Sequence, residues 1–469
     1  GHIKWWVKDG NMNVSAGVGP ASDGKDELII RKGENEWERI AEWGYEDSFS
    51  NSAICITRDG KYIYLIDSRN SNTGRLLKIN IQTREKEVLF HDPRYDFDGW
   101  INFSRNPDSI LIHPDTYEIE AITCNREKKE WVILDKNLED DFKAIKKFSE
   151  GEFHIVSRDS LNEKWIICFD CDNESHKYYL FDRPAKKEEF LFYSRPEMNE
   201  YTFSKMDHIS FTARDGLEIN GYISYPSGEN RKNLPLVLYV HGGPWSRDIW
   251  GFNPVTQWLT NRGYVCLQVN FRGSKGFGKD FLNAGDREWG GKMQDDLADG
   301  VRWAIEQGIA DPKKIAIYGG SYGGYAALAG AAFTPDLFCC SVAYFAISNL
   351  ITYIKSIPPQ WEVFRNELVK RIGDPDKEED FLMSRSPLFS VDKIKIPVMI
   401  LHGANDPRIK KVEAEQIEEA MKQKGLPCEC VIFSDEGHGL AGAENKNMFF
   451  GKIEKFFAKY LGGRYEEFI

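Results

Sequence analysis

The sequence lacks several features that would place it in a large class of proteins. Among its 469 residues, no apolar run approaches the roughly 20 residues that a membrane-spanning helix needs. Lys and Arg do not cluster on one periodic face and the net charge is −12, so neither a membrane nor nucleic acid is expected as a partner. The glycine-rich segment 270–278 lacks both the G-x-x-x-x-G-K-[ST] and the G-x-G-x-x-G phosphate-binding patterns. We therefore expect no cofactor.

Cysteine is present, but its number and spacing do not indicate a framework of disulfide bonds. The nine cysteines are an odd number and are scattered, which is typical of reduced thiols in a cytoplasmic protein. No signal peptide is recognised, so a cytoplasmic location is predicted. Cys168 and Cys171 form a C-x-x-C pair with His176 nearby, but no second pair accompanies them. For that reason no metal site is expected.

The chain is longer than one ordinary domain, and its pattern changes near residue 205. Residues 1–205 show little helical periodicity and many short aromatic strands. Arg58 and Arg158 occupy matching positions in two similar segments, 56–59 and 156–159, that lie 100 residues apart (158 − 58), which is two periods of about fifty. Strand pairs recur at 28–30 with 37–40, 76–79 with 88–90, 120–123 with 131–134, and 178–181 with 190–192. This repetition predicts an all-β, partial β-propeller-like domain of about four blades, with a plain meander or sandwich as the alternative.

Residues 206–469 alternate between strands and helices, which predicts an α/β domain with a mostly parallel sheet. A hairpin is expected at 208–223, and helical runs are expected between the later strands, including 293–305 and 412–422. The expected strands of the main sheet are 236–240, 264–270, 315–318, 340–345, 396–401 and 429–434.

The segment 319–323, Gly-Gly-Ser-Tyr-Gly, fits the G-x-S-x-G elbow of α/β-hydrolases. Such an elbow holds a serine on a sharp strand-to-helix turn, where side chains two residues either side would collide with neighbouring backbone. The following helix directs its free N–H groups at a developing oxyanion. Ser321 is therefore the candidate nucleophile.

Two further residues complete the order Ser, Asp, His that this fold requires. Asp406 follows the strand 396–401, and His438 follows the strand 429–434. Both lie just past the carboxyl end of a strand, where open α/β sheets place their sites. Upstream, the strand 236–240 leads into His-Gly-Gly-Pro-Trp at 241–245. The backbone N–H groups of Gly243 and Tyr322 are the candidate oxyanion hole.

With these motifs, residues 206–465 resemble the catalytic domain of the prolyl oligopeptidase family, nearest its acylaminoacyl-peptidase-like branch. The resemblance is carried by the segments 241–244, 270–274, 289–291, 319–325, 384–387, 405–408 and 437–438. It implies a serine peptidase capped by a β-propeller, with Ser321 as nucleophile, Asp406 as orienting acid and His438 as base.

The resemblance also implies residues that bind substrate. Arg408 occupies the place, two residues past the acid, of an arginine that holds a substrate carbonyl in the family. Trp245 and Ile409 match positions that line the pocket for the residue before the scissile bond. Family propellers usually have seven blades, whereas about 200 residues suffice here for roughly four. Either the domain is truncated or the remainder is supplied otherwise, and unpaired blade edges would favour a homo-oligomer through residues 1–205.

Three functions are compatible with the sequence. The leading hypothesis is a serine peptidase that hydrolyses short peptides, N-acylated ones among them, through an acyl-enzyme. A carboxylesterase acting on small acyl esters would use the same triad. A non-catalytic interaction protein is disfavoured because every catalytic position is filled.

Overall fold

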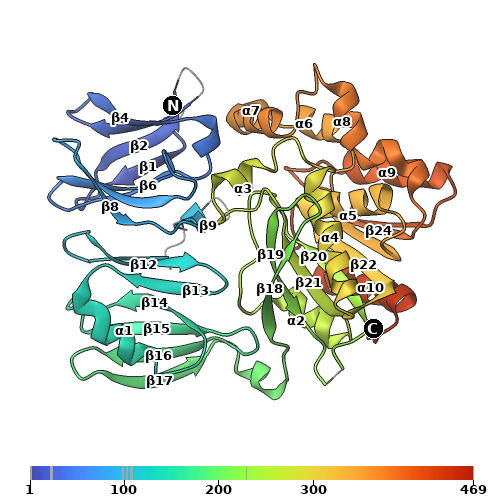
Figure 1. Cartoon of the computed structure of the whole chain (residues 1–469), viewed down its shortest axis with the longest axis horizontal. Coiled ribbons are helices and arrows are strands. Elements are labelled where there is room, and N and C mark those ends of the chain that lie inside the picture. The colour runs from blue at the N-terminus through green and yellow to red at the C-terminus, as the bar shows by residue number, and fades with distance from the viewer. Residues whose placement is uncertain are drawn as a thin grey trace. The chain divides into compact units, whose positions relative to one another are not determined.

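The computed structural model describes residues 3–21, 25–97, 100–101, 104–105, 109–228 and 230–467 (Figure 1). The chain divides into two compact units. The N-terminal unit comprises 1–201 together with the short segments 249–252 and 275–283, and the C-terminal unit comprises 202–248, 253–274 and 284–469.

The N-terminal unit is built from antiparallel sheets whose strands pair in chain order. The first two sheets have four strands each: β1 (Trp5–Lys8), β2 (Val14–Pro20), β3 (Asp26–Arg31) and β4 (Trp37–Trp43), then β5 (Ser52–Ile56), β6 (Tyr62–Asp67), β7 (Arg75–Asn80) and β8 (Lys86–Phe90). Two smaller sheets follow: β9 (Trp100–Ile101) with β10 (Ser104–Arg105), and β11 (Ile110–Ile112), β12 (Ile119–Asn125) and β13 (Lys129–Ile133). After helix α1 (Glu139–Ile145), the last sheet comprises β14 (Glu152–Arg158), β15 (Lys164–Asp170), β16 (Lys177–Asp182) and β17 (Lys187–Tyr193). The expected all-β character is confirmed, and the recurring strand pairs correspond to β3–β4, β7–β8, β12–β13 and β16–β17.

Alternating side chains explain how these sheets form cores. One cluster joins the first sheet to the second and includes Val18, Leu28 and Leu65, none of which is exposed. A second joins β11–β13, α1 and the last sheet, with Phe142 of α1 and Trp165 of β15 at its centre. In both, the residues of one strand face bury an apolar stripe against the neighbouring sheet.

The segment 275–283, which contains helix α3 (Lys279–Asn283), folds as part of the N-terminal unit, and we call it the strap. Lys279 Nζ lies 2.9 Å from Asp47 Oδ1. Asp96 accepts a hydrogen bond from the Gly278 N–H at 3.0 Å. The strap is therefore held by ionic and backbone contacts to residues more than 180 positions earlier in the chain.

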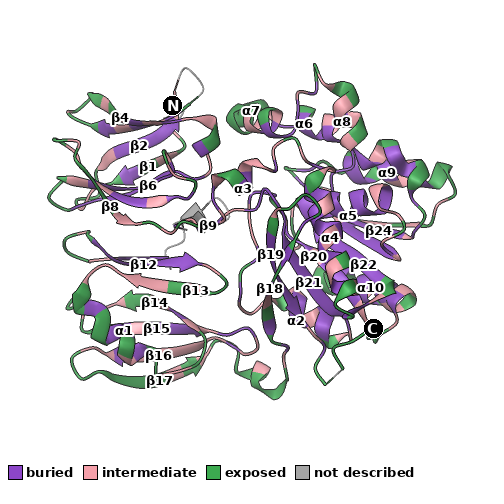
Figure 2. Ribbon diagram, viewed as in Figure 1, coloured by how far each residue is buried: buried purple, intermediate pink, exposed green. Residues whose placement is uncertain are grey.

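The C-terminal unit contains an eight-stranded sheet in the order β18-β19-β21-β20-β22-β23-β24-β25. Its strands are β18 (Met206–Thr212), β19 (Glu218–Ser224), β20 (Leu234–Val240), β21 (Val265–Asn270), β22 (Ala310–Gly320), β23 (Cys340–Tyr344), β24 (Val398–Gly403) and β25 (Cys428–Phe433). The pairs β18–β19 and β19–β21 are antiparallel, and the other pairs are parallel. The parallel strands β21, β23 and β24 are almost continuously buried, as expected for the centre of a sheet covered on both faces (Figure 2).

Helices cover both faces of this sheet. The helices of the C-terminal unit are α2 (Pro254–Asn261), α4 (Lys292–Glu306), α5 (Tyr322–Phe333), α6 (Leu350–Lys355), α7 (Glu362–Arg371), α8 (Glu379–Arg385), α9 (Val412–Gln423) and α10 (Ala443–Leu461). On one face, α2 and α10 pack against the core around Tyr318. On the other, Gly330 of α5 lies against Ile317 and Gly300 of α4 lies against Val269, at distances that leave little room for a side chain. Within the described residues, no helix is both long and apolar enough to cross a membrane.

Candidate active site

Ser321 occupies the turn between β22 and α5 with φ 58° and ψ −120°, in a region that side chains other than glycine rarely adopt. The two glycines of the elbow are required by close backbone contacts. A Cβ added to Gly319 would lie 2.6 Å from the backbone of Gly323, and one added to Gly323 would lie 2.1 Å from Val240 O. The elbow thus packs against the start of α5 on one side and the end of β20 on the other, which is why glycine is needed at both positions.

The three candidate catalytic side chains form one hydrogen-bonded chain. Nε2 of His438 lies 3.2 Å from Oγ of Ser321. Nδ1 of the same ring lies 2.6 Å from Oδ2 of Asp406. A proton on Nδ1 leaves Nε2 free to accept the serine proton, which is the arrangement that a general base needs.

Asp406 is buried and holds its charge through hydrogen bonds. Its second oxygen, Oδ1, accepts the backbone N–H groups of Arg408 at 2.8 Å and Ile409 at 2.9 Å. Burial by itself would raise the pKa of Asp406, but the hydrogen bonds from His438 and from the Ile409 backbone outweigh it and leave that pKa below its ordinary value. The carboxylate therefore stays ionised beside His438.

The loop after β20 lies against the nucleophile. A Cβ added to Gly242 would approach the Cβ of Ser321 to 3.5 Å, and Gly243 has a φ of 126° that favours glycine. His241 is buried, its Nε2 lies 3.0 Å from Ser274 Oγ, and burial lowers its pKa to about 4. His241 is therefore neutral, and its hydrogen bond to Ser274 holds the loop 241–245 in place. Tyr322 is the first residue of α5, where helical N–H groups have no intrahelical acceptor.

The three residues assigned to substrate binding differ in exposure. Arg408 is exposed, and its guanidinium makes no hydrogen bond or ion pair with any described residue. Ile409 and Trp245 are each 2% exposed. A charged group without a partner beside Asp406 can bind a ligand carbonyl, whereas buried apolar groups can only shape a pocket wall.

Sequence reasoning missed side chains that hold these residues in place. Arg371 is 1% exposed, lies 2.7 Å from both Asp286 and Glu367, and its guanidinium carbon lies 5.8 Å from the ring centre of Trp245. These partners come from separate segments with no shared pattern. The sequence of α7 gives no signal for the arrangement, because Lys370 directly precedes Arg371 and the pair is typical of a basic helix end.

A second missed residue is Glu413 in α9. Its Oε2 accepts the backbone N–H groups of Ser348 at 3.0 Å and Asn349 at 2.9 Å. The adjoining helix α6 carries Tyr353, whose pKa is raised by burial and, to a smaller extent, by the charge of Glu413. Glu413 therefore links the start of α6 to α9, the helix that follows the Asp406 loop.

Comparison with known proteins assigns the family. A model of the prolyl oligopeptidase family matches residues 250–464. Dipeptidyl aminopeptidase BIII of Pseudoxanthomonas mexicana is 38% identical over 473 residues, which cover 99% of this chain and 67% of that protein. The chain belongs to the prolyl oligopeptidase family.

Two other peptidases extend the comparison. Dipeptidyl peptidase family member 6 of Caenorhabditis elegans is 35% identical, over 93% of this chain and 61% of its own length. The solved structure of Pyrococcus horikoshii acylaminoacyl peptidase superimposes with a TM-score of 0.71 at 21% identity, over 97% of this chain and 70% of that one, and so shows the same fold. The chain thus spans about two thirds of the length of these relatives.

The family and the fold class expected from the sequence are confirmed, and the chain is a serine-peptidase-type α/β-hydrolase. The carboxylesterase alternative is not favoured, because these relatives are named as peptidases.

Proposed function

We propose that this peptidase removes dipeptides from the free N-termini of short peptides. The observation that carries the proposal is the hydrogen-bonded chain from Ser321 through His438 to Asp406. It occurs in a chain that matches two relatives over 99% and 93% of its length, and both of these are named as dipeptidyl peptidases.

In this mechanism, Ser321 Oγ attacks the scissile carbonyl while His438 Nε2 takes its proton. The ionised Asp406 stabilises the imidazolium that forms. The backbone N–H groups of Gly243 and Tyr322 stabilise the oxyanion. His438 then returns the proton to the leaving amine, and water hydrolyses the acyl-enzyme in a second, similar step.

The residues next to Ser321, His438 and Asp406 bind the substrate. The guanidinium of Arg408 binds a carbonyl of the peptide, because it is exposed and carries an unmatched charge. Trp245 and Ile409 line the pocket for the side chain before the scissile bond, which suits their apolar, buried character.

A second candidate substrate is an N-acylated peptide, because acylaminoacyl peptidase shares the fold over 97% of this chain. Anilides distinguish the two: one carrying a dipeptide with a free amine, the same dipeptide N-acetylated, and an N-acetylated single residue. We expect hydrolysis of the first alone. Turnover confined to the acetylated anilides would favour the acylaminoacyl activity, and turnover of none would overturn both.

The matched control is Ser321→Ala, which removes the nucleophile and leaves the elbow glycines unchanged. It should lower kcat by about 10⁵–10⁶-fold and abolish labelling by a fluorophosphonate probe. Stoichiometric labelling of this variant would remove Ser321 from its proposed role.

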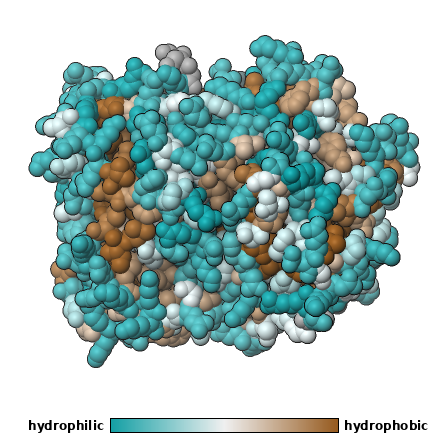
Figure 3. Space-filling view, viewed as in Figure 1, coloured by the Kyte–Doolittle hydropathy of each residue, from teal (hydrophilic) through white to brown (hydrophobic). Residues whose placement is uncertain are grey.

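We also propose that the chain forms a homo-oligomer through residues 1–205. The N-terminal unit exposes large apolar side chains, including Trp6 at 51%, Val88 at 51% and Phe192 at 52%. Val88 and Phe192 lie on β8 and β17, each the last strand of its sheet. Figure 3 shows apolar surface over strands of this unit, within a mostly polar face. Light scattering tests the proposal, and a monomer that persists at every concentration would refute it.

A cytoplasmic location is likewise proposed, because none of the nine cysteines, all within the described residues, forms a disulfide and a reducing compartment keeps thiols in that state. Alkylation of the protein in unreduced cell extract should modify every accessible thiol. Native disulfides found in the same extract would contradict the location.

A further inference from the structure

The hairpin β14–β15 gathers ligand-type side chains on one of its faces. In its register, His154 lies opposite Cys168, and Glu152 lies opposite Asp170. Because side chains alternate along a strand, these four residues share a face, while their neighbours such as Phe153 lie in the apolar core. A thiol, an imidazole and a carboxylate are thus brought together by pairing alone.

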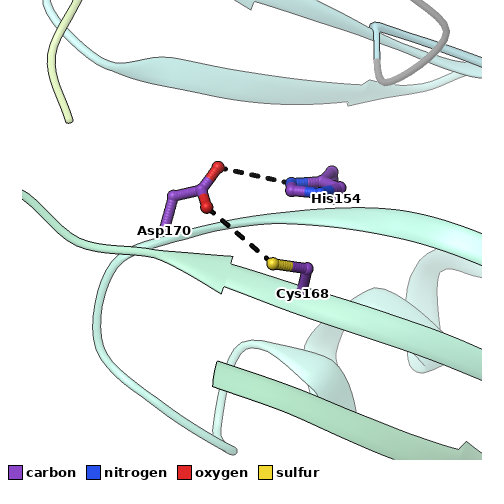
Figure 4. A group of neighbouring side chains, drawn as sticks. All are labelled: His154, Cys168 and Asp170. Atoms are coloured by element: carbon purple, nitrogen blue, oxygen red, sulfur yellow. Dashed lines mark hydrogen bonds and ion pairs between the residues drawn. The ribbon is translucent and has the colours of Figure 1, made fainter. Parts of the chain in front are cut away.

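The reactive atoms of three of these side chains lie close to one another (Figure 4). His154 Nδ1 lies 3.3 Å from Asp170 Oδ2, and Cys168 Sγ lies 3.8 Å from Asp170 Oδ1. All three ligand atoms lie within 4.8 Å of one another. His154 Nδ1 is buried, and Asp170 approaches it at ion-pair distance without the alignment of a good hydrogen bond.

The separations of 3.3 and 3.8 Å from the two oxygens of Asp170 are close to the edges of a tetrahedral zinc site, and all three ligand atoms lie within 4.8 Å of one another. With Zn–S of about 2.3 Å and Zn–N and Zn–O of about 2.0–2.2 Å, the edges of a tetrahedron are about 3.3–3.8 Å. Thiolate and imidazole together favour Zn²⁺ over Mg²⁺ or Ca²⁺, which prefer oxygen ligands alone. We propose that His154, Cys168 and Asp170 bind a zinc ion in the last sheet of the N-terminal unit.

The fourth position is left to a water molecule. His176, directly before β16, has its Nε2 3.4 Å from Asp170 Oδ1, and its side chain is 43% exposed. It does not belong to the group of ligand atoms that lie within 4.8 Å of one another, so water completes the tetrahedron. On binding, the thiol proton of Cys168 leaves to solvent and a Zn–S bond replaces the S–H bond.

The surrounding backbone holds the ligands in place. Gly151 adopts a φ of 103°, and a Cβ there would lie 2.3 Å from Asp170 O, so the start of β14 lies directly against the end of β15. Glu152 accepts the backbone N–H of Lys129 at 2.6 Å and so ties this hairpin to β13. A site built on paired strands needs little reorganisation to bind its ion.

The structure also replaces the C-x-x-C interpretation of the sequence. Cys171 lies beyond the end of β15, and its Sγ lies 3.2 Å from Glu150 O. Cys171 does not belong to the group of ligand atoms around Asp170. It therefore provides a matched control cysteine, three positions from Cys168.

Cobalt binding to the whole chain tests the proposal without reference to peptidase activity. After treatment with a chelator and dialysis, the chain should bind one Co²⁺, with a thiolate-to-cobalt charge-transfer band, and Zn²⁺ should displace it. Cys168→Ser should abolish that band and weaken binding by more than the 10–100-fold that loss of an outer-shell contact costs. Cys171→Ser should retain both the band and the affinity.

Cys168 is fully buried, so Cys168→Ser could fail to fold. Two further variants test the site independently of that outcome. Asp170→Asn and His154→Gln change more accessible side chains and should each weaken Co²⁺ binding by a similar factor. The absence of saturable binding at one ion per chain would overturn the proposal. Affinity unchanged in the Asp170 and His154 variants would overturn it equally.

Discussion

Replacing Asp406 by Asn isolates what its charge does, because the change preserves part of its hydrogen bonding. The Asn carbonyl can still accept the backbone N–H groups of Arg408 and Ile409, which now lie 2.8 and 2.9 Å from Oδ1. The amide –NH₂ would then replace Oδ2, which lies 2.6 Å from His438 Nδ1. The amide N–H and an Nδ1–H of His438 are both donors and cannot hydrogen-bond to each other. His438 must therefore carry its proton on Nε2, which then cannot accept the proton of Ser321.

The expected loss follows from this change of tautomer. The same replacement in a serine protease of unrelated fold lowers kcat about 10⁴-fold, which corresponds to about 5.4 kcal/mol at 1.36 kcal/mol per tenfold. We expect a similar loss for Asp406→Asn, with the melting temperature close to that of the parent chain.

The assay compares kcat on a dipeptidyl anilide with thermal unfolding of the same samples. Asp435→Asn is the matched control, because Asp435 is exposed, lies three residues before His438 and accepts a hydrogen bond from Asn445 at 3.0 Å. It should keep its activity within about twofold. A loss below tenfold for Asp406→Asn in a folded protein would refute the tautomer argument.

Three other changes have distinct expected outcomes. Arg408→Ala should reduce peptide turnover by about 10–150-fold, the equivalent of a charge-assisted bond of about 1.5–3 kcal/mol, and leave small esters nearly unaffected; equal losses on both would indicate a structural arginine. Gly323→Ala should lower the yield of folded protein and its melting temperature, because its Cβ would meet Val240 O at 2.1 Å; unchanged thermal unfolding would contradict this contact. Burial raises the pKa of Asp248 from 3.8 to about 7, so the folded chain keeps a proton that the unfolded chain loses, and this carboxyl lowers stability as pH rises from about 4 to 7. Asp248→Asn should therefore gain melting temperature relative to the parent as pH rises through that window, and a constant difference would contradict the shift.

The features that the sequence predicted best are local ones. The elbow around Ser321 needs glycine at specific positions, so its pattern is visible in five consecutive residues. Asp406 and His438 could be singled out because each follows a buried strand, and parallel strands deliver such residues to one edge of the sheet. The amphipathic helix α4 showed the same clarity, since its buried residues recur every four positions.

Features that depend on long-range packing were not predictable. Arg371 reaches Trp245 across 126 positions (371 − 245), and nothing in either segment signals the other. The group formed by His154, Cys168 and Asp170 depends on the register of a hairpin, whereas the sequence drew attention to Cys171, only three residues along. A shift of one residue in that register would send these side chains to opposite faces.

The strap has a consequence for how the chain could be divided. A cut near residue 205 would leave segment 275–283 in the C-terminal fragment and remove the partners of Lys279 and Gly278. The residue directly before the strap, Ser274, is hydrogen-bonded to His241 in the loop beside the nucleophile. A C-terminal fragment expressed alone would therefore lose the contacts of the strap one residue from Ser274, whose hydrogen bond holds His241 in place. We expect co-expression of the N-terminal fragment to restore these contacts.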